Sequence, residues 1–297
     1  MRDPAIIRLL PDGRRLHMND GPIDLIIEAD GTTLAVQAAY KAAARRFVTI
    51  LDELCGELRL LRSQWSSSSS TLSGPIARTM ASAVQPYCQQ QFITPMAAVA
   101  GAVAEAVLAE MVRTADLDRA YVNNGGDIAL YLSGGQRYAL GMIERPDSPA
   151  LFGSIEISAQ SPVRGVATSG WRGRSFSLGI ADAVTVLAES ASQADAAATV
   201  VANAVNLAGH SAITRIPANE ISPDSDLGHI PVTRDVGSLS LSDVEAALQN
   251  GMRAADDLHK RCLIRSAALC LQGEVRVVAP SVDSARFELP QRSLHYA

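Results

Sequence analysis

The chain has 297 residues, of which 47% are hydrophobic and 19% are charged, and its formal net charge is −5. A chain of this size and composition can bury a large core, so we expect a globular fold and not a disordered one. The acidic balance, the lack of a dense Lys/Arg block and the aromatic content of 4% argue against a nucleic-acid partner.

Targeting and membrane signals are the next property of the sequence. The first residues, MRDPAIIRLLPDGRRLH, lack the apolar segment and small-residue cleavage site of a secretory signal. Glu105 and Glu110 interrupt the longest apolar stretch, residues 95–112, so we expect no membrane-spanning helix. We therefore predict a cytoplasmic protein without a membrane partner.

The cysteines carry a separate hypothesis. Their positions are Cys55, Cys88, Cys262 and Cys270, with no C-x-x-C pair and no zinc spacing to the five histidines. This distribution is typical of reduced thiols. A redox or sulfur-carrying role for Cys88 or Cys55 is the alternative.

The N-terminal third reads as a hairpin followed by helices. Residues 6–11 and 22–30 are strand-like, with DGRR as the turn between them. Apolar spacings of three and four predict a helix over 34–61, and a second helix over 76–87. Between them, residues 63–74 (SQWSSSSSTLSG) cannot bury apolar surface, which favours a mobile loop or lid.

The middle of the chain contains a glycine motif between strands. Residues 95–111 form a helix with small residues on several faces, so another element must approach it closely. A strand over 119–122 then leads into Asn123-Asn124-Gly125-Gly126-Asp127. Paired glycines expose backbone N–H groups that can hold a pyrophosphate, with Asn123 and Asp127 as polar contacts; a simple turn is the alternative. Residues 128–132 and 137–143 are predicted to pair as a hairpin.

The stretch 165–205 combines hydroxyls, glycine and one carboxylate. A strand ends in Thr168-Ser169-Gly170, where glycine lets the backbone approach a ligand. A buried strand is predicted over 183–188, and a helix capped by Ser192 follows, with Asp195 in its first turn. Asp195 and Thr199 lie four residues apart on one helix face and can offer two oxygens to Mg²⁺. The alternative is that Asp195 caps the helix and Thr199 packs.

The C-terminal third carries weaker signals. Residues 211–218 are strand-like, and Asp224, Asp226 and His229 fall in a polar loop that matches no metal site. Ser242-x-x-Glu245 is a capping box that opens a helix towards Leu271. A strand follows from 274, and the tail from 281 is expected to be loosely held. The two similar halves hint at an internal duplication within one domain over 1–297.

Taken together, these motifs resemble the ApbE-like family, whose best-studied members are Mg²⁺-dependent flavin transferases that split FAD and attach FMN to a threonine. The matching positions follow the order of the family motifs: Gly101 and Glu105, Asn123 with Gly125-Gly126-Asp127, Ala167 to Gly170, and Ala194-Asp195-Ala196 with Thr199. Gly141 with Pro146 fits a further family pattern.

The resemblance implies an α+β fold of two T-fold-like halves, each an antiparallel sheet packed with helices. It also implies that Asp195 and Thr199 bind the metal together with a backbone carbonyl. Gly125, Gly126, Thr168, Ser169 and Gly170 would lie along the diphosphate, with Mg²⁺ and FAD or FMN as cofactors. A small planar ligand and a homo-oligomer are the expected partners.

Two family features are missing. Ala100 stands where the transferases have lysine, and residues 175–182 replace the H-x-x-D-P-x-T-G segment. That segment, with PMAAVAGAVAE and SDLGHIPV, is similar to the uncharacterised, UPF-type branch of the family. Three functions therefore remain: a Mg²⁺-dependent enzyme acting on a flavin or nucleotide diphosphate, a non-catalytic protein that binds a flavin- or pterin-like ligand, and a cysteine-dependent enzyme of sulfur metabolism.

Overall fold

The structure is a computed structural model that describes residues 4–66, 68, 71–143, 151–279, 281–282 and 285–288. Its strands are β1 (Ile6–Leu9), β2 (Leu16–Asp20), β3 (Ile23–Asp30), β4 (Arg119–Asn124), β5 (Asp127–Leu132), β6 (Arg137–Ile143), β7 (Leu151–Ser158), β8 (Gly165–Ser169), β9 (Ala183–Ala188), β10 (Ile213–Pro217), β11 (Pro231–Val236), β12 (Ser266–Leu271), β13 (Glu274–Val278), β14 (Ser281–Val282) and β15 (Ala285–Glu288). Its helices are α1 (Thr33–Gly56), α2 (Leu58–Leu61), α3 (Pro75–Val84), the 3₁₀ turn η1 (Pro95–Ala98), α4 (Val99–Thr114), α5 (Ala191–Ala204), α6 (Ala218–Ile221) and α7 (Leu241–Lys260).

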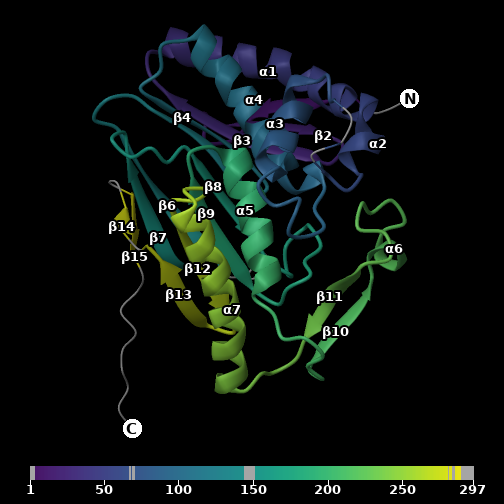
Figure 1. Ribbon diagram of the computed structural model, residues 1–297. Helices are drawn as coiled ribbons and strands as arrows, with labels where there is room; N and C mark the ends of the chain where they lie inside the picture. Colours follow the sequence, from purple (N-terminus) through teal and green to yellow (C-terminus); the bar gives the residue numbers. More distant parts are fainter. Residues whose placement is uncertain are drawn as a thin grey trace.

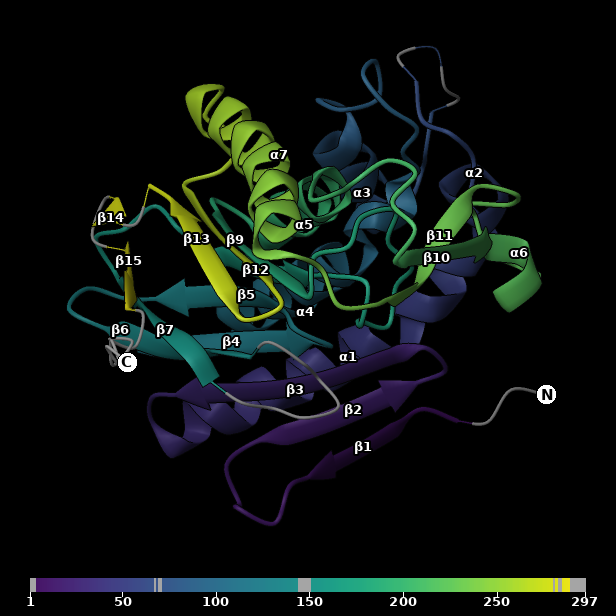
Figure 2. The ribbon, with the colours of Figure 1, turned by 90° about the horizontal axis from the view of Figure 1, so that it is seen from below.

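A large antiparallel sheet organises the molecule. Nine strands pair in the order β1-β2-β3-β4-β5-β8-β9-β12-β13, and helices α1, α4, α5 and α7 cover one of its faces (Figure 1). Helix α3 packs on α4 and α5. A smaller sheet, β14-β15-β7-β6, packs on the other face of its middle strands (Figure 2). The predicted fold class, α+β with antiparallel sheets packed by helices, is confirmed. The internal duplication and the T-fold-like halves stay predictions.

Alternating side chains divide the core in two. On β8, Val166 faces the smaller sheet and Ala167 faces the helices. On β12, Ala268 faces the smaller sheet and Leu269 faces the helices. Because the central strands are buried on both faces, they read as continuous apolar runs, which is why 183–188 is recognisable as a strand from sequence.

Two predicted hairpins are wrong. The N-terminal segment is a three-stranded meander, since residues 16–20 form β2, with Leu16 and Met18 buried under α1. Residues 128–132 do not pair with 137–143: β5 lies between β4 and β8, whereas β6 leaves the sheet to pair with β7. The apolar residues on both faces of β5 favour a central position, and a Gly-Gly turn alone does not decide which strands pair.

The predicted helix starts and ends near α5 and α7 also need correction. Ser190, not Ser192, caps α5, which places Asp195 in the second turn. Ser240, not Ser242, caps α7, and its hydroxyl also contacts the Asp243 carboxylate. Helix α7 ends at Lys260, because the chain enters the central strand β12 at Ser266.

The predicted loose tail is wrong for the part that the structure describes, since β14 and β15 join β7 in the smaller sheet. The serine-rich stretch has no helix or strand at its described positions. Both of its ends are held: the Trp65 amide donates to the Ile93 carbonyl at 2.8 Å, and the Gly74 amide donates to Glu57 at 2.7 Å. Its mobility stays a prediction. Pro146 lies outside the described residues.

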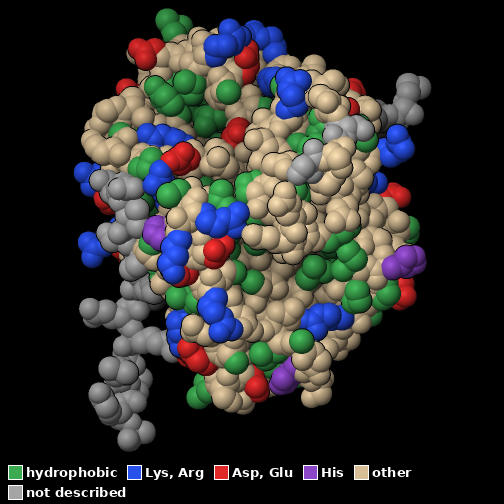
Figure 3. All heavy atoms as spheres, viewed as in Figure 1, with side chains coloured by type: hydrophobic (Ala, Val, Ile, Leu, Met, Phe, Trp, Pro, Cys, Tyr) green, Lys and Arg blue, Asp and Glu red, His purple; other side chains and the backbone are tan. Residues whose placement is uncertain are grey.

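One segment, Pro95–Thr114, is long and apolar enough to cross a membrane, so the two glutamates do not exclude it by composition. Half of its most apolar window is buried, and α4 packs against α1 and α5. This packing is the behaviour of a core helix. On the face shown in Figure 3, basic and acidic side chains are interspersed and neither kind forms a continuous area.

Candidate functional site

Helices α4 and α5 cap each other, and this contact positions Asp195. The Asp195 carboxylate accepts hydrogen bonds from the backbone amides of Gly101 (3.0 Å) and Ala100, at the start of α4. In return, Glu105 of α4 accepts from the Ser192 amide at the start of α5, at 2.6 Å. Each carboxylate satisfies amides that have no partner within their own helix. Asp195 therefore does cap a helix, as the alternative prediction proposed, but that helix is α4 and not α5, to which Asp195 belongs.

Gly101 makes this crossing close. A Cβ at this position would overlap the Ala191 carbonyl and lie 2.7 Å from the Ser192 nitrogen. Alanines buried along α5 let the two helices approach over their length. The small residues of the 95–111 helix thus serve helix packing, as their distribution predicted.

The β4–β5 hairpin positions the second carboxylate. Gly125 and Gly126 have φ values of +67° and +116°, which glycine adopts without strain. The Asn123 side chain accepts from the Gly126 amide at 2.9 Å and closes the turn. Asp127 is the first residue of β5, and its carboxylate accepts from the Thr168 backbone amide. The glycine motif therefore turns the chain so that Asp127 points towards α5.

Asp127 and Asp195 form an acid pair that shares one cavity. Burial raises the pKa of Asp127 to about 7, although the Thr168 amide acts to lower it. Burial also raises the pKa of Asp195 well above its ordinary value, and the negative charge of Asp127 adds to this effect. Each residue keeps some solvent exposure because the cavity opens onto it. Among the described residues, no Lys, Arg or His forms an ion pair with either carboxylate.

The cavity above the acid pair has a volume of about 480 Å³. Thr199, one turn after Asp195, also lines it. Its walls are both apolar and polar. They include Phe92, Ile93, Thr94, Met96, Val99, Ala100, Arg174, Phe176, Leu178, Val200, Asn203, Asp224, Ser225, Asp226 and Leu227. The Thr94 hydroxyl donates to the Asp226 carboxylate and joins two of these walls.

The other predicted site residues lie beside this cavity and not in its lining. The Thr168 hydroxyl is 2.9 Å from that of Thr185, on the neighbouring strand. A Cβ on Gly170 would overlap the Asp182 carbonyl, so this glycine permits a close approach of the chain to itself and not to a ligand. Ser169 ends β8. Of the predicted residues, Asp127, Asp195 and Thr199 line the cavity.

The donor set suits Mg²⁺ better than a softer metal. The described residues hold no cluster of three or more His, Cys, Asp or Glu side chains, so no closed protein cage is present. Two carboxylates and one hydroxyl supply hard oxygens, and Mg²⁺ keeps water or phosphate in its remaining positions. Two adjacent half-buried acids that share no ion pair with a described Lys, Arg or His are a costly arrangement, which a divalent cation relieves.

Sequence reasoning missed Asn124. This buried side chain donates to the Ala100 carbonyl at 3.1 Å, and so holds the start of α4, whose amides bind Asp195. Its signal was available: Ala120, Val122 and Asn124 alternate on one face of β4, so an amide at the third position must find a partner in the core.

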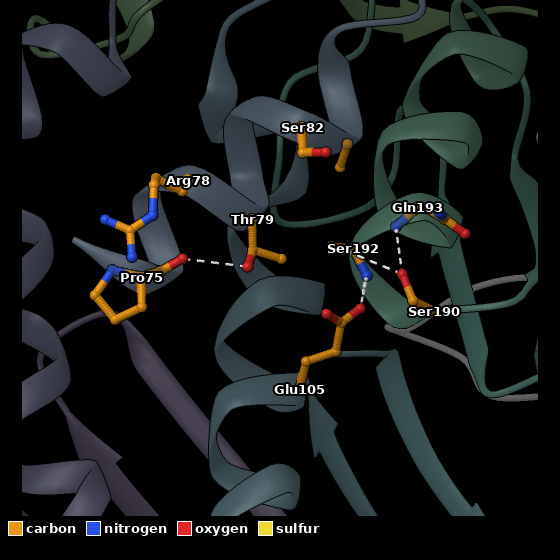
Figure 4. Close-up of a pocket in the computed structure, with 9 residues that line it drawn as sticks. Pro75, Arg78, Thr79, Ser82, Glu105, Ser190, Ser192 and Gln193 are labelled. Atoms are coloured by element: carbon orange, nitrogen blue, oxygen red, sulfur yellow. Dashed lines mark hydrogen bonds between the residues drawn. The ribbon is translucent and has the colours of Figure 1, made fainter. Parts of the chain in front are cut away.

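A second cavity, of about 500 Å³, lies beside the start of α5 (Figure 4). Arg78 and Thr79 of α3 stand on one side, and Ser190 and Gln193 on the other. Figure 4 shows Glu105 reaching up to the Ser192 amide between them, so this helix start already has a carboxylate partner.

Glu105→Ala is expected to lower the free energy of unfolding by about 1–2 kcal/mol, because the substitution removes a charged cap from α5. Urea denaturation followed by circular dichroism measures the change. Glu110→Ala, which removes a surface ion pair with Arg113 in the last turns of the same helix, is the control and should change stability by less than about 0.5 kcal/mol. Equal effects of the two substitutions would contradict the capping role.

Comparison with known families covers almost the whole chain. A family model described as AbpE bacteria matches residues 7–277. Among individual proteins, the UPF0280 protein MK0206 of Methanopyrus kandleri is 38% identical over 135 residues, which is 45% of this chain and 51% of that protein. A UPF0280 protein of Methanothrix thermoacetophila is 41% identical over 114 residues, covering 38% and 46%. The matches thus span about half the length of these relatives.

Two solved structures are similar at a low level. A mutant of the flavin transferase ApbE from Vibrio cholerae superimposes with a TM-score of 0.45 and 12% identity, over 92% of this chain and 96% of that one. The apo flavinyl transferase ApbE of Pseudomonas stutzeri gives 0.42 and 9%, over 94% and 95%. The family match is the stronger finding: the chain belongs to the family described as AbpE bacteria, an ApbE-like family whose relatives here are UPF0280 proteins.

Proposed function

We propose that the cavity over Asp127 and Asp195 binds Mg²⁺ and, with it, the diphosphate of a flavin nucleotide such as FAD. The observation that carries the proposal is the acid pair: two half-buried carboxylates face one cavity, and no described cation pairs with either. Thr199 supplies a third oxygen from the same face of α5 as Asp195. When bound, the ion would act as a Lewis acid on the phosphate oxygens.

The residues around the pair would have distinct tasks. Asn124 and the α4 amides orient Asp195, and the Thr168 amide orients Asp127. The apolar side chains of Phe92, Met96 and Phe176 would cover a planar ring and keep water from it. These residues bind and orient the metal and the ligand; splitting FAD or transferring FMN would need further catalytic groups.

A non-catalytic binding protein is the second candidate. Ala100 offers no cation where the transferases have lysine, and its backbone atoms are engaged by Asn124 and Asp195. Ser175, Phe176 and Leu178 line the cavity in place of a histidine-bearing segment. Both features favour a protein that keeps a flavin- or pterin-like ligand without turnover.

Titration calorimetry with FAD, with and without Mg²⁺, followed by chromatography of the mixture, tests these candidates. Mg²⁺-dependent binding with release of FMN and AMP identifies a diphosphate-cleaving enzyme. Mg²⁺-dependent binding with intact FAD identifies a carrier, or a transferase that needs its acceptor. Binding that ignores Mg²⁺ contradicts the metal proposal.

The cysteine hypothesis has less support in the geometry. The buried Cys88 thiol donates to the Gln85 carbonyl at 3.2 Å and does not line the described cavity over the acid pair. We expect Cys88→Ser to leave FAD binding unchanged, and loss of binding by a folded variant would revive this alternative. All four cysteines are free thiols, which accords with a cytoplasmic location. A homo-oligomer stays a prediction.

Metal affinity is expected to rise with pH. Mg²⁺ needs ionised carboxylates, and burial raises the pKa of Asp127 to about 7, so a proton must leave before the ion binds near neutral pH. The apparent affinity should increase roughly tenfold or more from pH 6 to pH 8 and then level off. Calorimetry in buffers of different ionisation enthalpy should detect proton release at pH 6.5. An affinity independent of pH over this range would contradict the acid-pair site.

The same acids make the metal-free protein less stable as pH rises. In the folded state Asp127 keeps its proton up to about pH 7, whereas the unfolded chain loses it near the ordinary value of 3.8. The folded state therefore binds more protons between these values, and the free energy of unfolding should fall across that window. Adding Mg²⁺ at pH 8 should raise the free energy of unfolding again.

A further inference from the structure

Arg174 is an exposed cation that lines the same cavity. It belongs to the segment between β8 and β9, and its side chain is exposed and lines the cavity together with Asp127 and Asp195. Its guanidinium group donates to the Pro22 carbonyl at 3.3 Å, a neutral acceptor. Within the described ranges, Arg174 takes part in no ion pair, in contrast to Arg172, which pairs with Asp182 at 2.9 Å.

The guanidinium group lies over the β4–β5 hairpin. A Cβ on Gly125 would be 3.5 Å from Arg174 Nη1, so the glycine leaves the group free of a side chain on that side. The turn is the one that delivers Asp127 to the cavity floor. Arg174 therefore has a defined place beside the turn that leads to Asp127, and within the described residues the Pro22 carbonyl is the one acceptor that its side chain bonds.

The arginine and the acid pair are separated. No ion pair joins Arg174 to Asp127 or Asp195 among the described residues, and Arg174 is not one of the groups that shift the pKa of Asp127. A direct pairing with Asp127 would lower that pKa. The cavity of about 480 Å³ thus has two half-buried carboxylic acids at one place on its lining, and at another an arginine with no ion-pair partner among the described residues.

We propose that Arg174 binds the phosphate oxygens of the ligand, so that a diphosphate ester bridges the acid pair and this arginine. The inference rests on the proposed function, because the metal supplies the link between the carboxylates and the phosphates. With a divalent cation bound, the charges of the two carboxylates are balanced, and the phosphates keep negative charge that Arg174 meets. A planar guanidinium donates two parallel hydrogen bonds to phosphate oxygens.

The test is calorimetric titration of the full chain with inorganic pyrophosphate in excess Mg²⁺, and with Mg²⁺ alone. We expect Arg174→Ala to weaken pyrophosphate binding roughly ten- to a hundredfold, the range for losing charged hydrogen bonds. Mg²⁺ alone should bind this variant as it binds the wild type. Arg174→Lys keeps the positive charge but not the two parallel donors of the guanidinium group, so it should lose less pyrophosphate affinity than Arg174→Ala.

Two further variants are the controls. Arg234→Ala removes an exposed arginine of β11 that does not line the cavity, and it should bind pyrophosphate like the wild type. Arg62→Ala removes the other arginine of the described lining and should cost less than Arg174→Ala. Affinity of Arg174→Ala within twofold of wild type, or a larger loss in Arg62→Ala, overturns the inference.

The experiment separates the inference from the proposed function. If wild-type affinity for pyrophosphate is the same with and without Mg²⁺, the metal proposal fails, while the Arg174→Ala ratio still decides the role of the arginine. If the wild type binds no pyrophosphate under either condition, both are overturned.

Discussion

Asp195→Asn is expected to abolish Mg²⁺-dependent FAD binding while the protein stays folded. Asparagine is isosteric, and its carbonyl oxygen can still accept from the Gly101 amide at the start of α4. It carries no charge, so the cation loses one of its two carboxylates. We expect affinity to fall by at least about a hundredfold, since one partner of a buried charge pair costs several kcal/mol. Calorimetry at pH 8 measures the loss.

The variant should also show that the charge of Asp195 destabilises the metal-free protein. Burial and the charge of Asp127 raise the pKa of Asp195, so its ionised form is unfavourable in the folded protein. Removing this charge should therefore not lower the free energy of unfolding of the metal-free protein at pH 8. Its melting temperature without Mg²⁺ should equal or exceed that of the wild type. Asp224→Asn, an exposed carboxylate that lines the same cavity, is the matched control and should retain Mg²⁺-dependent binding. Similar losses in both variants would indicate a general electrostatic effect and not a metal ligand.

Gly101→Ala is the substitution with the largest expected effect on stability. The added Cβ would overlap the Ala191 carbonyl and lie 2.7 Å from the Ser192 nitrogen, and backbone atoms cannot move aside as a flexible side chain does. Helices α4 and α5 must separate, which also disturbs the contacts of Asp195 and Glu105. We expect a loss of about 3 kcal/mol or more in the free energy of unfolding.

Gly56→Ala is the control for that substitution. Gly56 ends α1, and an added Cβ there meets no atom of the described residues within 4 Å. Alanine restricts the unfolded chain more than glycine, so this variant should be unchanged or stabilised by about 0.4–1 kcal/mol. A Gly101→Ala protein as stable as the Gly56→Ala protein would show that the helices do not need this contact.

Much of the site was predictable because it depends on local spacing. Asp195 and Thr199 share a face of α5 whatever surrounds the helix. The positive φ values of the β4–β5 turn require glycines, so Gly125 and Gly126 indicate a tight turn that ends at Asp127. The apolar run of β9 marks a strand at the centre of a sheet.

The failures share a different cause, which is pairing over long distances. Ser190 and Ser192 are equally good caps by type, and the choice depends on where the chain meets Gly165, whose Cβ would overlap Ser190. The exchange of caps between α4 and α5 joins residues about ninety positions apart, and no local pattern encodes it. Residues 222 and 224–227 of the connection between β10 and β11 form one wall of the cavity. This wall contacts Thr94 through Asp226, a residue far away in the sequence, so the contact exists only in the assembled fold.

Counting the Mn²⁺ ions bound per chain tests whether the acid pair is a divalent cation site. Mn²⁺ replaces Mg²⁺ at oxygen ligands and is visible by electron paramagnetic resonance. We expect one tightly bound Mn²⁺ in the wild type at pH 8, displaced by Mg²⁺, and none in Asp195→Asn. Equal binding by the two proteins, or no bound Mn²⁺ in the folded wild type, would contradict it.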